Sequence, residues 1–324
     1  MMKRLASAFY GLAALALSAG VSAQTSAYPS KPVRIMVPYA VGGIADNIAR
    51  VIGQKLTDAW GQPVVVENRA GAGGNIGTSV VAGSAPDGHT LVMGNIGTHA
   101  VNQYLVKNMP FDPIKDFVPI VHVLDLEGLL VVNSSDSIKT VAELIALARS
   151  QPGKLTYASA GLGTTSHLAG ELFKSMAKVD LVHVPYKGNQ PAIADLVGGL
   201  TNLAFATMPT VLPRVKEGRL RAIAVIGTSR AQALPDVPTV GETLPGFAVS
   251  NWIGLFAPAG TPAEIVAKIH AEVQRIMQTP EVAKRLEPEG AKFIPMSSEA
   301  FAQFQKNEAM KWSKVIRDAG IQAQ

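Results

Sequence analysis

The sequence of 324 residues contains no cysteine, and this absence excludes several classes of protein at once. Disulfide-stabilised scaffolds, zinc fingers, cysteine-ligated iron–sulfur clusters and enzymes with a cysteine nucleophile all require the missing side chain. Charged residues are also scarce, at 16% against 48% hydrophobic residues, whereas disordered chains are rich in charge and poor in apolar side chains. The composition therefore predicts a folded chain. A length of 324 residues predicts two domains, or one large domain.

Sequence motifs of several enzyme classes are missing as well. The chain has neither the H-E-x-x-H motif of zinc proteases nor a phosphate-binding loop that ends in Gly-Lys-Ser/Thr. Residues 71–77 approach a dinucleotide-binding fingerprint, but Ile76 replaces its third glycine, and at residues 157–161 Tyr157 replaces the first glycine of a nucleophile elbow. No metal-ligand spacing on one helix face occurs among His89, His99, His122, His167, His183 and His270. We therefore expect no metal, no cofactor and no enzyme activity.

The first 23 residues have the pattern of a secretory signal peptide. Lys3 and Arg4 precede an apolar run over residues 5–17, and Val21-Ser22-Ala23 supplies the small residues of a cleavage site. A membrane anchor would need about 20 apolar residues, and this run is shorter and is interrupted by glycine. We expect cleavage after Ala23 and export to the periplasm.

The charge of the exported chain is close to balanced. Cleavage would remove two basic residues and no acidic one, which lowers the formal net charge from +5 to +3. So small a charge gives no electrostatic reason to bind nucleic acid or a membrane surface. No cysteine follows the signal, so we expect no lipid attachment there.

After the signal, short β-branched runs alternate with longer helical patterns. Such alternation is typical of βαβ units, and it predicts an α/β fold with mainly parallel sheets flanked by helices. Residues 261–324 read as nearly all helical, and the proline-rich residues 230–248 read as a segment that crosses between domains. The expected strands are 33–37, 64–67, 90–94, 129–133, 155–158, 182–184, 202–206 and 220–226. The expected helices include 45–59, a helix that follows the glycine-rich residues 71–77 and ends near 83, a helix that begins at Thr140, 164–177 and 191–197.

Three glycine-rich polar loops each follow a predicted strand and precede a helix or turn. They are residues 38–43, residues 95–99 and residues 159–165. In open α/β sheets, ligands bind outside the carboxyl ends of the strands, where such loops gather. A helix N-terminus offers unpaired backbone N–H groups and a partial positive charge, so these loops can bind a carboxylate or phosphate without Arg or Lys. The alternative interpretation is that each loop is only a short connection.

Seven runs, in this order and spacing, carry a resemblance to a known family. The chain resembles the Bug-type substrate-binding receptors of tripartite tricarboxylate transporters along essentially all of its length after the signal. The runs are residues 38–43 with Asp46 and Arg50, residues 67–77 (ENRAGAGGNIG), Pro86-Asp87-Gly88, residues 157–172 (YASAGLGTTSHLAGEL), residues 183–188 (HVPYKG), residues 234–239 (LPDVPT) and residues 254–262 (GLFAPAGTP).

The resemblance implies a periplasmic-binding-protein-like fold of two α/β lobes that close on a ligand held between them. Lobe 1 would comprise residues 24–123 and 249–324, and lobe 2 residues 124–248. The ligand carboxylate would lie between the first-strand loop of one lobe and a helix start of the other. The residues implied for this clamp are Tyr39, Gly42 and Gly43, facing Ser159, Gly163, Thr164 and Thr165; Asn95, Thr98, Asn189 and Thr207 would line the rest of the cleft.

The same resemblance implies an extracytoplasmic receptor that delivers a small carboxylate to a membrane permease. The ligand could be a dicarboxylate or tricarboxylate, an amino acid or an aromatic acid, and the receptor is expected to be a monomer. No acidic or basic residue marks the far end of the predicted pocket, which favours a neutral or aromatic tail on the ligand.

Two other functions stay open on the sequence alone. One is an exported hydrolase that uses Ser159 with His167 or His99, for which a histidine must lie within hydrogen-bond reach of Ser159. The other is a sensor whose closed form binds a signalling protein, because ligand binding by itself does not distinguish sensing from transport.

Overall fold

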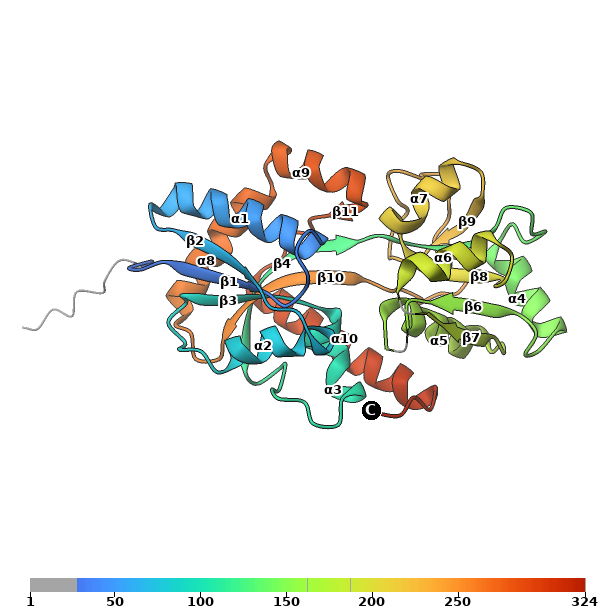
Figure 1. Cartoon of the computed structure of the whole chain (residues 1–324), viewed down its shortest axis with the longest axis horizontal. Helices are drawn as coiled ribbons and strands as arrows, with labels where there is room; N and C mark the ends of the chain where they lie inside the picture. Colours follow the sequence, from blue (N-terminus) through green and yellow to red (C-terminus); the bar gives the residue numbers. More distant parts are fainter. Residues whose placement is uncertain (1–27, 162, 187, 324) are drawn as a thin grey trace, which may run out of the picture.

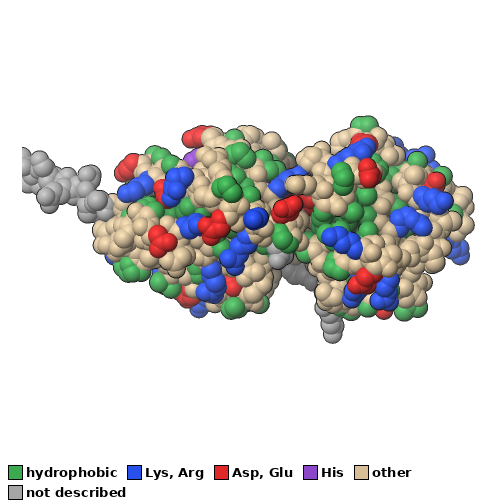
Figure 2. Space-filling model, turned by 90° about the horizontal axis from the view of Figure 1, so that it is seen from above, with side chains coloured by type: hydrophobic (Ala, Val, Ile, Leu, Met, Phe, Trp, Pro, Cys, Tyr) green, Lys and Arg blue, Asp and Glu red, His purple; other side chains and the backbone are tan. Residues whose placement is uncertain are grey.

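A computed structural model describes residues 28–161, 163–186 and 188–323. The predicted signal peptide lies outside the described residues. Figure 1 shows two α/β units side by side, each with a central sheet and helices on both faces, and Figure 2 shows the waist between them. Within the described ranges, no helix is long and apolar enough to cross a membrane.

The first unit contains a six-stranded sheet in the order β11-β4-β10-β3-β1-β2. β1 pairs in parallel with β2 and β3, whereas β10 runs antiparallel to β3 and β4. α1 and α8 pack on one face of the sheet, and α2 and α10 pack on the other. The strands are β1 (Val33–Val37), β2 (Val64–Asn68), β3 (Thr90–Asn95), β4 (Phe117–Leu126), β10 (Asn251–Pro258) and β11 (Ala291–Lys292). The helices are α1 (Ile44–Trp60), η1 (Ala72–Gly74), α2 (Asn75–Ala82), η2 (Gly97–Val101), α3 (Asn102–Leu105), α8 (Ala263–Met277), α9 (Pro280–Leu286), η4 (Glu287–Glu289) and α10 (Ser298–Asp318).

The second unit contains a five-stranded sheet in the order β7-β6-β8-β5-β9. β6 is parallel to β7 and β8, whereas β5 is antiparallel to β8 and β9. The strands are β5 (Gly128–Asn133), β6 (Thr156–Ser159), β7 (Val182–Pro185), β8 (Leu203–Thr207) and β9 (Leu220–Val225). The helices are α4 (Val141–Ser150), α5 (Thr165–Ala177), α6 (Asn189–Val197), α7 (Met208–Lys216) and η3 (Val240–Glu242).

The α/β fold class is confirmed, but both sheets are mixed and not mainly parallel. A helical crossover within one unit forces the strands that it joins to be parallel. β5 and β10 instead enter their sheets from the neighbouring unit, so no helix sets their direction. Only Glu127 separates β4 of the first sheet from β5 of the second.

One prediction about the C-terminal half is wrong. Residues 230–248 do not cross between the units but pack on the second one: Thr239 bridges Val225, and the Val249 N–H donates to the Ile226 carbonyl at 2.8 Å. The chain crosses just after them, where the Ser250 hydroxyl donates to Asp125 of β4. The helical prediction for residues 261–324 is confirmed for most of the segment, which forms α8, α9 and α10; the short strand β11 pairs with β4 between α9 and α10.

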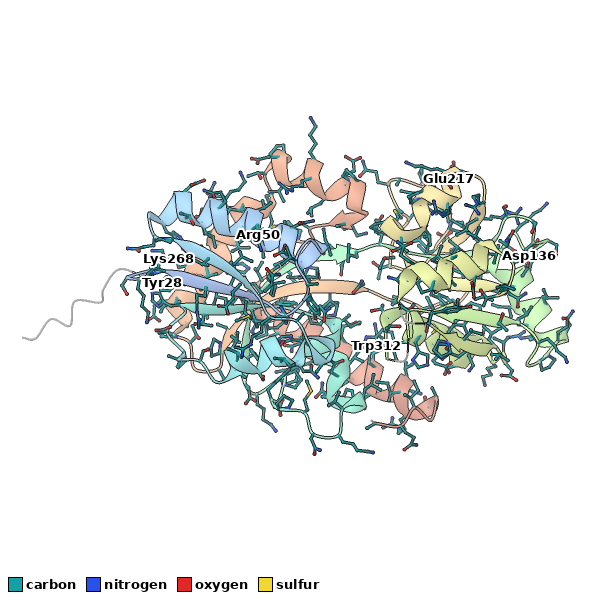
Figure 3. All side chains as sticks on the ribbon, in the orientation of Figure 1. Tyr28, Arg50, Asp136, Glu217, Lys268 and Trp312 are labelled. Carbon is teal, nitrogen blue, oxygen red and sulfur yellow. The ribbon has the colours of Figure 1, made fainter. Side chains whose placement is uncertain are left out.

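Helix α10 forms a third connection between the units. It contacts β4 of the first unit and α5 of the second. Trp312 of α10 lies where the helix passes between the two units (Figure 3). One core cluster therefore runs through both units and includes Trp312 and Phe256 together with Leu168 and Phe205. The division of the chain into lobes of residues 24–123 plus 249–324 and 124–248 stays a prediction.

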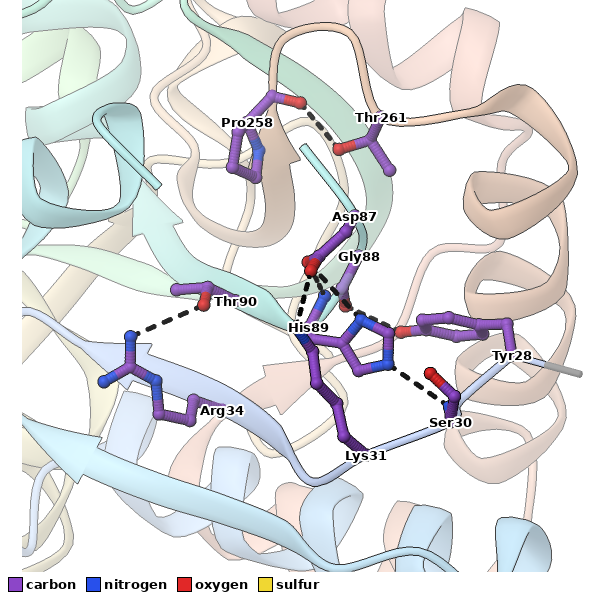
Figure 4. A network of polar contacts seen from close by, with 10 residues as sticks. All are labelled: Tyr28, Ser30, Lys31, Arg34, Asp87, Gly88, His89, Thr90, Pro258 and Thr261. Atoms are coloured by element: carbon purple, nitrogen blue, oxygen red, sulfur yellow. Dashed lines mark hydrogen bonds and ion pairs between the residues drawn. The ribbon is translucent and has the colours of Figure 1, made fainter. Parts of the chain in front are cut away.

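The start of the described chain is fixed to the first unit by polar contacts (Figure 4). The Tyr28 hydroxyl donates to the Gly88 carbonyl at 2.7 Å, and Lys31 pairs with Asp87 at 2.8 Å. The Ser30 N–H donates to Nε2 of His89 at 3.3 Å. These contacts hold the segment before β1 against the loop before β3.

Candidate functional site

Six strand-to-helix connections lie at the carboxyl edges of the two sheets. β1, β2 and β3 are parallel, so their carboxyl ends lie at one edge of the first sheet; β6, β7 and β8 do the same in the second. Each of these strands is followed by a helical segment, after a loop in every case except β8, which runs directly into α7. The connections after β2 and β3 in the first unit and after β6 in the second supply most of the residues that line the cavity described next, which places the two edges opposite each other.

A cavity of about 910 Å³ lies between the units. A smaller cavity of about 180 Å³ adjoins it and shares Thr164, Thr165 and Asn251 with it. The larger cavity is lined from the first unit by Ala72, Gly73, Asn95, Ile96, Gly97, Val101, Asn102, Leu105 and Val106, from the second by Gly163, Thr164, Thr165, His167, Leu168, Glu171 and Lys174, and by Asn251 and residues 319–322.

Six of the eleven predicted site residues line these cavities. Asn95 and Gly163 contact the larger one, Asn189 and Thr207 contact the smaller one, and Thr164 and Thr165 contact both. The structure thus brings the second-unit residues of the expected clamp together. Their role in ligand binding stays a prediction.

The other five predicted residues line neither cavity. Gly42 and Gly43 are exposed just before α1. Tyr39 is partly buried, and burial of its hydroxyl raises the pKa of that group. Thr98 is fully buried; its Oγ1 accepts the Asn95 N–H at 3.1 Å and contacts Nδ1 of His99 at 2.9 Å. Ser159, the fifth, is also buried.

The loop after β1 is held in place by Asp46, which is 1% exposed. Its carboxylate accepts the Gly42 N–H at 2.9 Å and the Asn68 amide at 3.0 Å, and it pairs with Arg50 at 2.9 Å. Burial raises the pKa of Asp46, but these hydrogen bonds and the Arg50 charge together bring the pKa below its usual value. Asp46 therefore stays charged and fixes the loop, as its i, i+4 spacing from Arg50 predicts.

The start of α5 is shaped by its own side chains. Thr164 is the N-cap: its hydroxyl donates to the Gly161 carbonyl at 2.7 Å and accepts the His167 N–H at 3.4 Å. The Ala160 N–H donates to Ser166 Oγ at 3.0 Å. These bonds set the loop before the helix, so the first turn of α5, with its partial positive charge, borders the cavity at Thr165.

The serine of the hydrolase alternative pairs with a different histidine from the two predicted. Ser159 Oγ lies 2.6 Å from Nε2 of His183 on β7, and His99 belongs to the first unit, stacked on Phe256 at 3.8 Å between ring centroids. Burial, and then the neighbouring His167, lower the pKa of His183 to about 4, which makes it a weak base. Ser159 is 1% exposed, so a substrate in the cleft does not reach its hydroxyl.

The expectation that no charged residue marks the far end of the pocket is wrong. Glu171 and Lys174 line the larger cavity, and Lys174 Nζ lies 3.0 Å from the Glu171 carboxylate. The Tyr157 hydroxyl also donates to Glu171, at 2.6 Å. The helical spacing of 168, 171 and 174 from Thr164 is the sequence signal that would have placed them on the cavity side of α5. Asn251 and residues 319–322 gave no such signal, since they arrive from the crossing strand and the C-terminal end.

No group of three or more His, Asp or Glu side chains suited to a metal ion occurs among the residues that the structure describes. The polar groups at the cavity are hydroxyls, amides and backbone N–H groups, with Lys174 as a cation and Glu171 as an anion. Such a set can bind an anion by hydrogen bonds from a helix start.

Two α/β lobes with a cavity between them are the architecture of periplasmic solute-binding proteins. The chain belongs to the tripartite tricarboxylate transporter receptor family, whose model matches residues 48–321.

The chain is 36% identical to Protein BugT of Bordetella pertussis, with 94% of each chain covered. Among solved structures, it is similar to Rpa4515 of R. palustris with adipate (TM-score 0.77, 35% identity, covering 92% of this chain and 100% of that one). It is also similar to MatC of Rhodopseudomonas palustris with bound malate (TM-score 0.72, 35% identity, covering 89% and 100%).

Proposed function

We propose that this protein is a periplasmic receptor that binds a small carboxylate between its lobes and delivers it to a membrane permease. The observation that carries the proposal is the start of α5, where Thr164 and Thr165 border both interlobe cavities. The adipate and malate held by two similar structures support a carboxylate as the ligand. Export by the signal peptide, a free unlipidated chain and a monomeric state belong to the same proposal.

The proposed clamp has two sides. The ligand carboxylate accepts hydrogen bonds at the first turn of α5 on one side, and on the other it meets the loop after β1 with Tyr39, Gly42 and Gly43. That loop lines neither cavity in this structure, so the lobes must approach for both sides to contact one ligand. Ligand binding then shifts the equilibrium toward the closed form, because only the closed form makes both sets of contacts.

A panel of acids and their amides tests the proposal. Thermal unfolding of residues 24–324 is measured after dialysis, with adipate, malate, tricarboxylates, amino acids and aromatic acids, each paired with its amide. An acid at about 100 times its dissociation constant should stabilise the native protein by about 2.7 kcal/mol, and its amide should not. An equal shift with acid and amide would contradict carboxylate recognition, and no shift with any acid would contradict the proposal as a whole.

A further inference from the structure

His167 makes an unusual contact with the loop that begins the proposed carboxylate site. Its side chain is 3% exposed, and its Nδ1 accepts the backbone N–H of Gly163 at 3.1 Å. Gly163 lines the larger cavity and has a φ of +74°, a conformation that a side chain disfavours. The imidazole thus fixes a left-handed backbone position, which glycine adopts without strain, immediately before the N-cap Thr164.

This hydrogen bond requires one protonation state of the ring. A neutral imidazole accepts at one nitrogen and donates at the other, whereas an imidazolium donates at both. Protonation of His167 would therefore direct an N–H group at the Gly163 N–H and break the contact. The neutral ring, with its proton on Nε2, is the form that fits this loop.

The surroundings of His167 favour the neutral ring at neutral pH. The ring stacks on His183 of β7 at 4.2 Å between centroids, and the nearby charged groups on α5 are Glu171 and Lys174. The Tyr157 hydroxyl of β6 also approaches, at 3.5 Å from the His167 carbonyl. Burial lowers the pKa of His167, and although Glu171 opposes this effect, Lys174 adds to it, so the pKa lies below its usual value.

We propose that His167 is a positioning residue for the carboxylate site: its unprotonated Nδ1 holds the Gly163 amide, and ligand binding weakens when acid protonates the ring. The proposal rests on the carboxylate-receptor function. The direction of the pH dependence follows from the hydrogen bond: Nδ1 accepts the Gly163 N–H only in the neutral ring, so the loop that binds the ligand requires neutral His167. Binding is therefore complete above the pKa of His167 in the folded protein and is lost as the pH falls through it.

Two substitutions separate the acceptor from the bulk of the ring. His167→Asn keeps an acceptor oxygen on the same branch of the side chain and cannot be protonated, whereas His167→Leu keeps the apolar volume and removes the acceptor. Calorimetry with adipate and malate at pH 7.5 should show a loss of about tenfold or more in affinity for His167→Leu. His167→Asn should stay within about threefold of the wild type, and His270→Asn, in the first unit, serves as the matched control.

The pH profile provides the second readout. Below the pKa of His167, wild-type affinity should fall by up to about tenfold per pH unit relative to His167→Asn, the limit for uptake of one proton. Both proteins see the same titration of the ligand itself, so this comparison removes it. Equal affinities of the Asn and Leu variants, or a wild type that binds more tightly in acid than His167→Asn, would overturn the proposal.

A measurement without ligand keeps this inference distinct from the proposed function. In ¹H–¹⁵N spectra of the free protein, the Gly163 amide should move with the protonation of His167, keep its neutral-pH position in His167→Asn, and be displaced at every pH in His167→Leu. If no acid binds but the amide behaves in this way, the receptor function fails and the positioning role stands. If the chemical shift of the Gly163 amide were the same with His, Asn or Leu at position 167 at every pH, the positioning role would be overturned.

Discussion

An aspartate at position 165 should abolish carboxylate binding and leave the fold intact. Thr165 is the first residue of α5 and borders both interlobe cavities. Thr165→Asp would place a fixed carboxylate where the ligand carboxylate is proposed to bind. Two unit charges about 4 Å apart repel by about 4 kcal/mol at an effective dielectric constant of about 20, which corresponds to an affinity loss of about a thousandfold. Calorimetry with adipate and malate measures this loss.

The neutral variant Thr165→Asn is the matched control for charge. It changes shape in a similar way without adding an anion, so we expect its affinity to stay within about tenfold of the wild type. Thr165→Asp should unfold no more easily than the wild type, because an acidic side chain in the first helical turn stabilises the helix by about 0.3–1 kcal/mol. Wild-type affinity in Thr165→Asp would contradict the placement of the ligand carboxylate at α5.

The largest loss of stability is expected for Trp312→Ala in helix α10. Trp312 is completely buried in the core cluster that joins the two units, and its Nε1 donates to Glu308 at 3.0 Å. Truncation leaves a large cavity and removes this partner from a carboxylate that is 6% exposed. Buried tryptophan-to-alanine substitutions cost about 3–5 kcal/mol in the free energy of unfolding, which urea denaturation should show.

Met310 of the same helix provides the comparison, since its side chain is 62% exposed. Met310→Ala should change the free energy of unfolding by no more than about 0.5 kcal/mol. If the two variants lost equal stability, α10 would not hold the lobes together through Trp312.

Elements with local signals were predicted well from the sequence. β1 was predicted at its observed bounds, and α1 was predicted to within a residue, since Ile48, Ile52 and Leu56 repeat every four positions and are buried. β10 was missed because glycine and proline interrupt its apolar run and Ile253 is its one β-branched residue, so its composition does not mark a strand. Residues 230–248 were misplaced because proline-rich composition indicates turns without saying which unit they pack against.

In the site too, features set by neighbouring residues were predicted, and features set by tertiary contacts were missed. The helix start near Thr164 was predicted and is confirmed, because N-caps depend on a few consecutive residues. His183 was not paired with Ser159, because their contact depends on the parallel register of β6 and β7, which places Ser159 opposite Pro185. Glu171 and Lys174 become part of the cavity only once α5 is oriented against the first unit.

The central claim is that a carboxylate binds between the lobes at the start of α5. A crystal structure with the acid that gives the largest thermal shift tests it most directly. The account predicts a ligand carboxylate within about 3 Å of hydrogen-bond donors at the first turn of α5, with the loop of residues 38–43 closed over its other side. A carboxylate bound outside the cleft, or held by one lobe alone, would contradict the account.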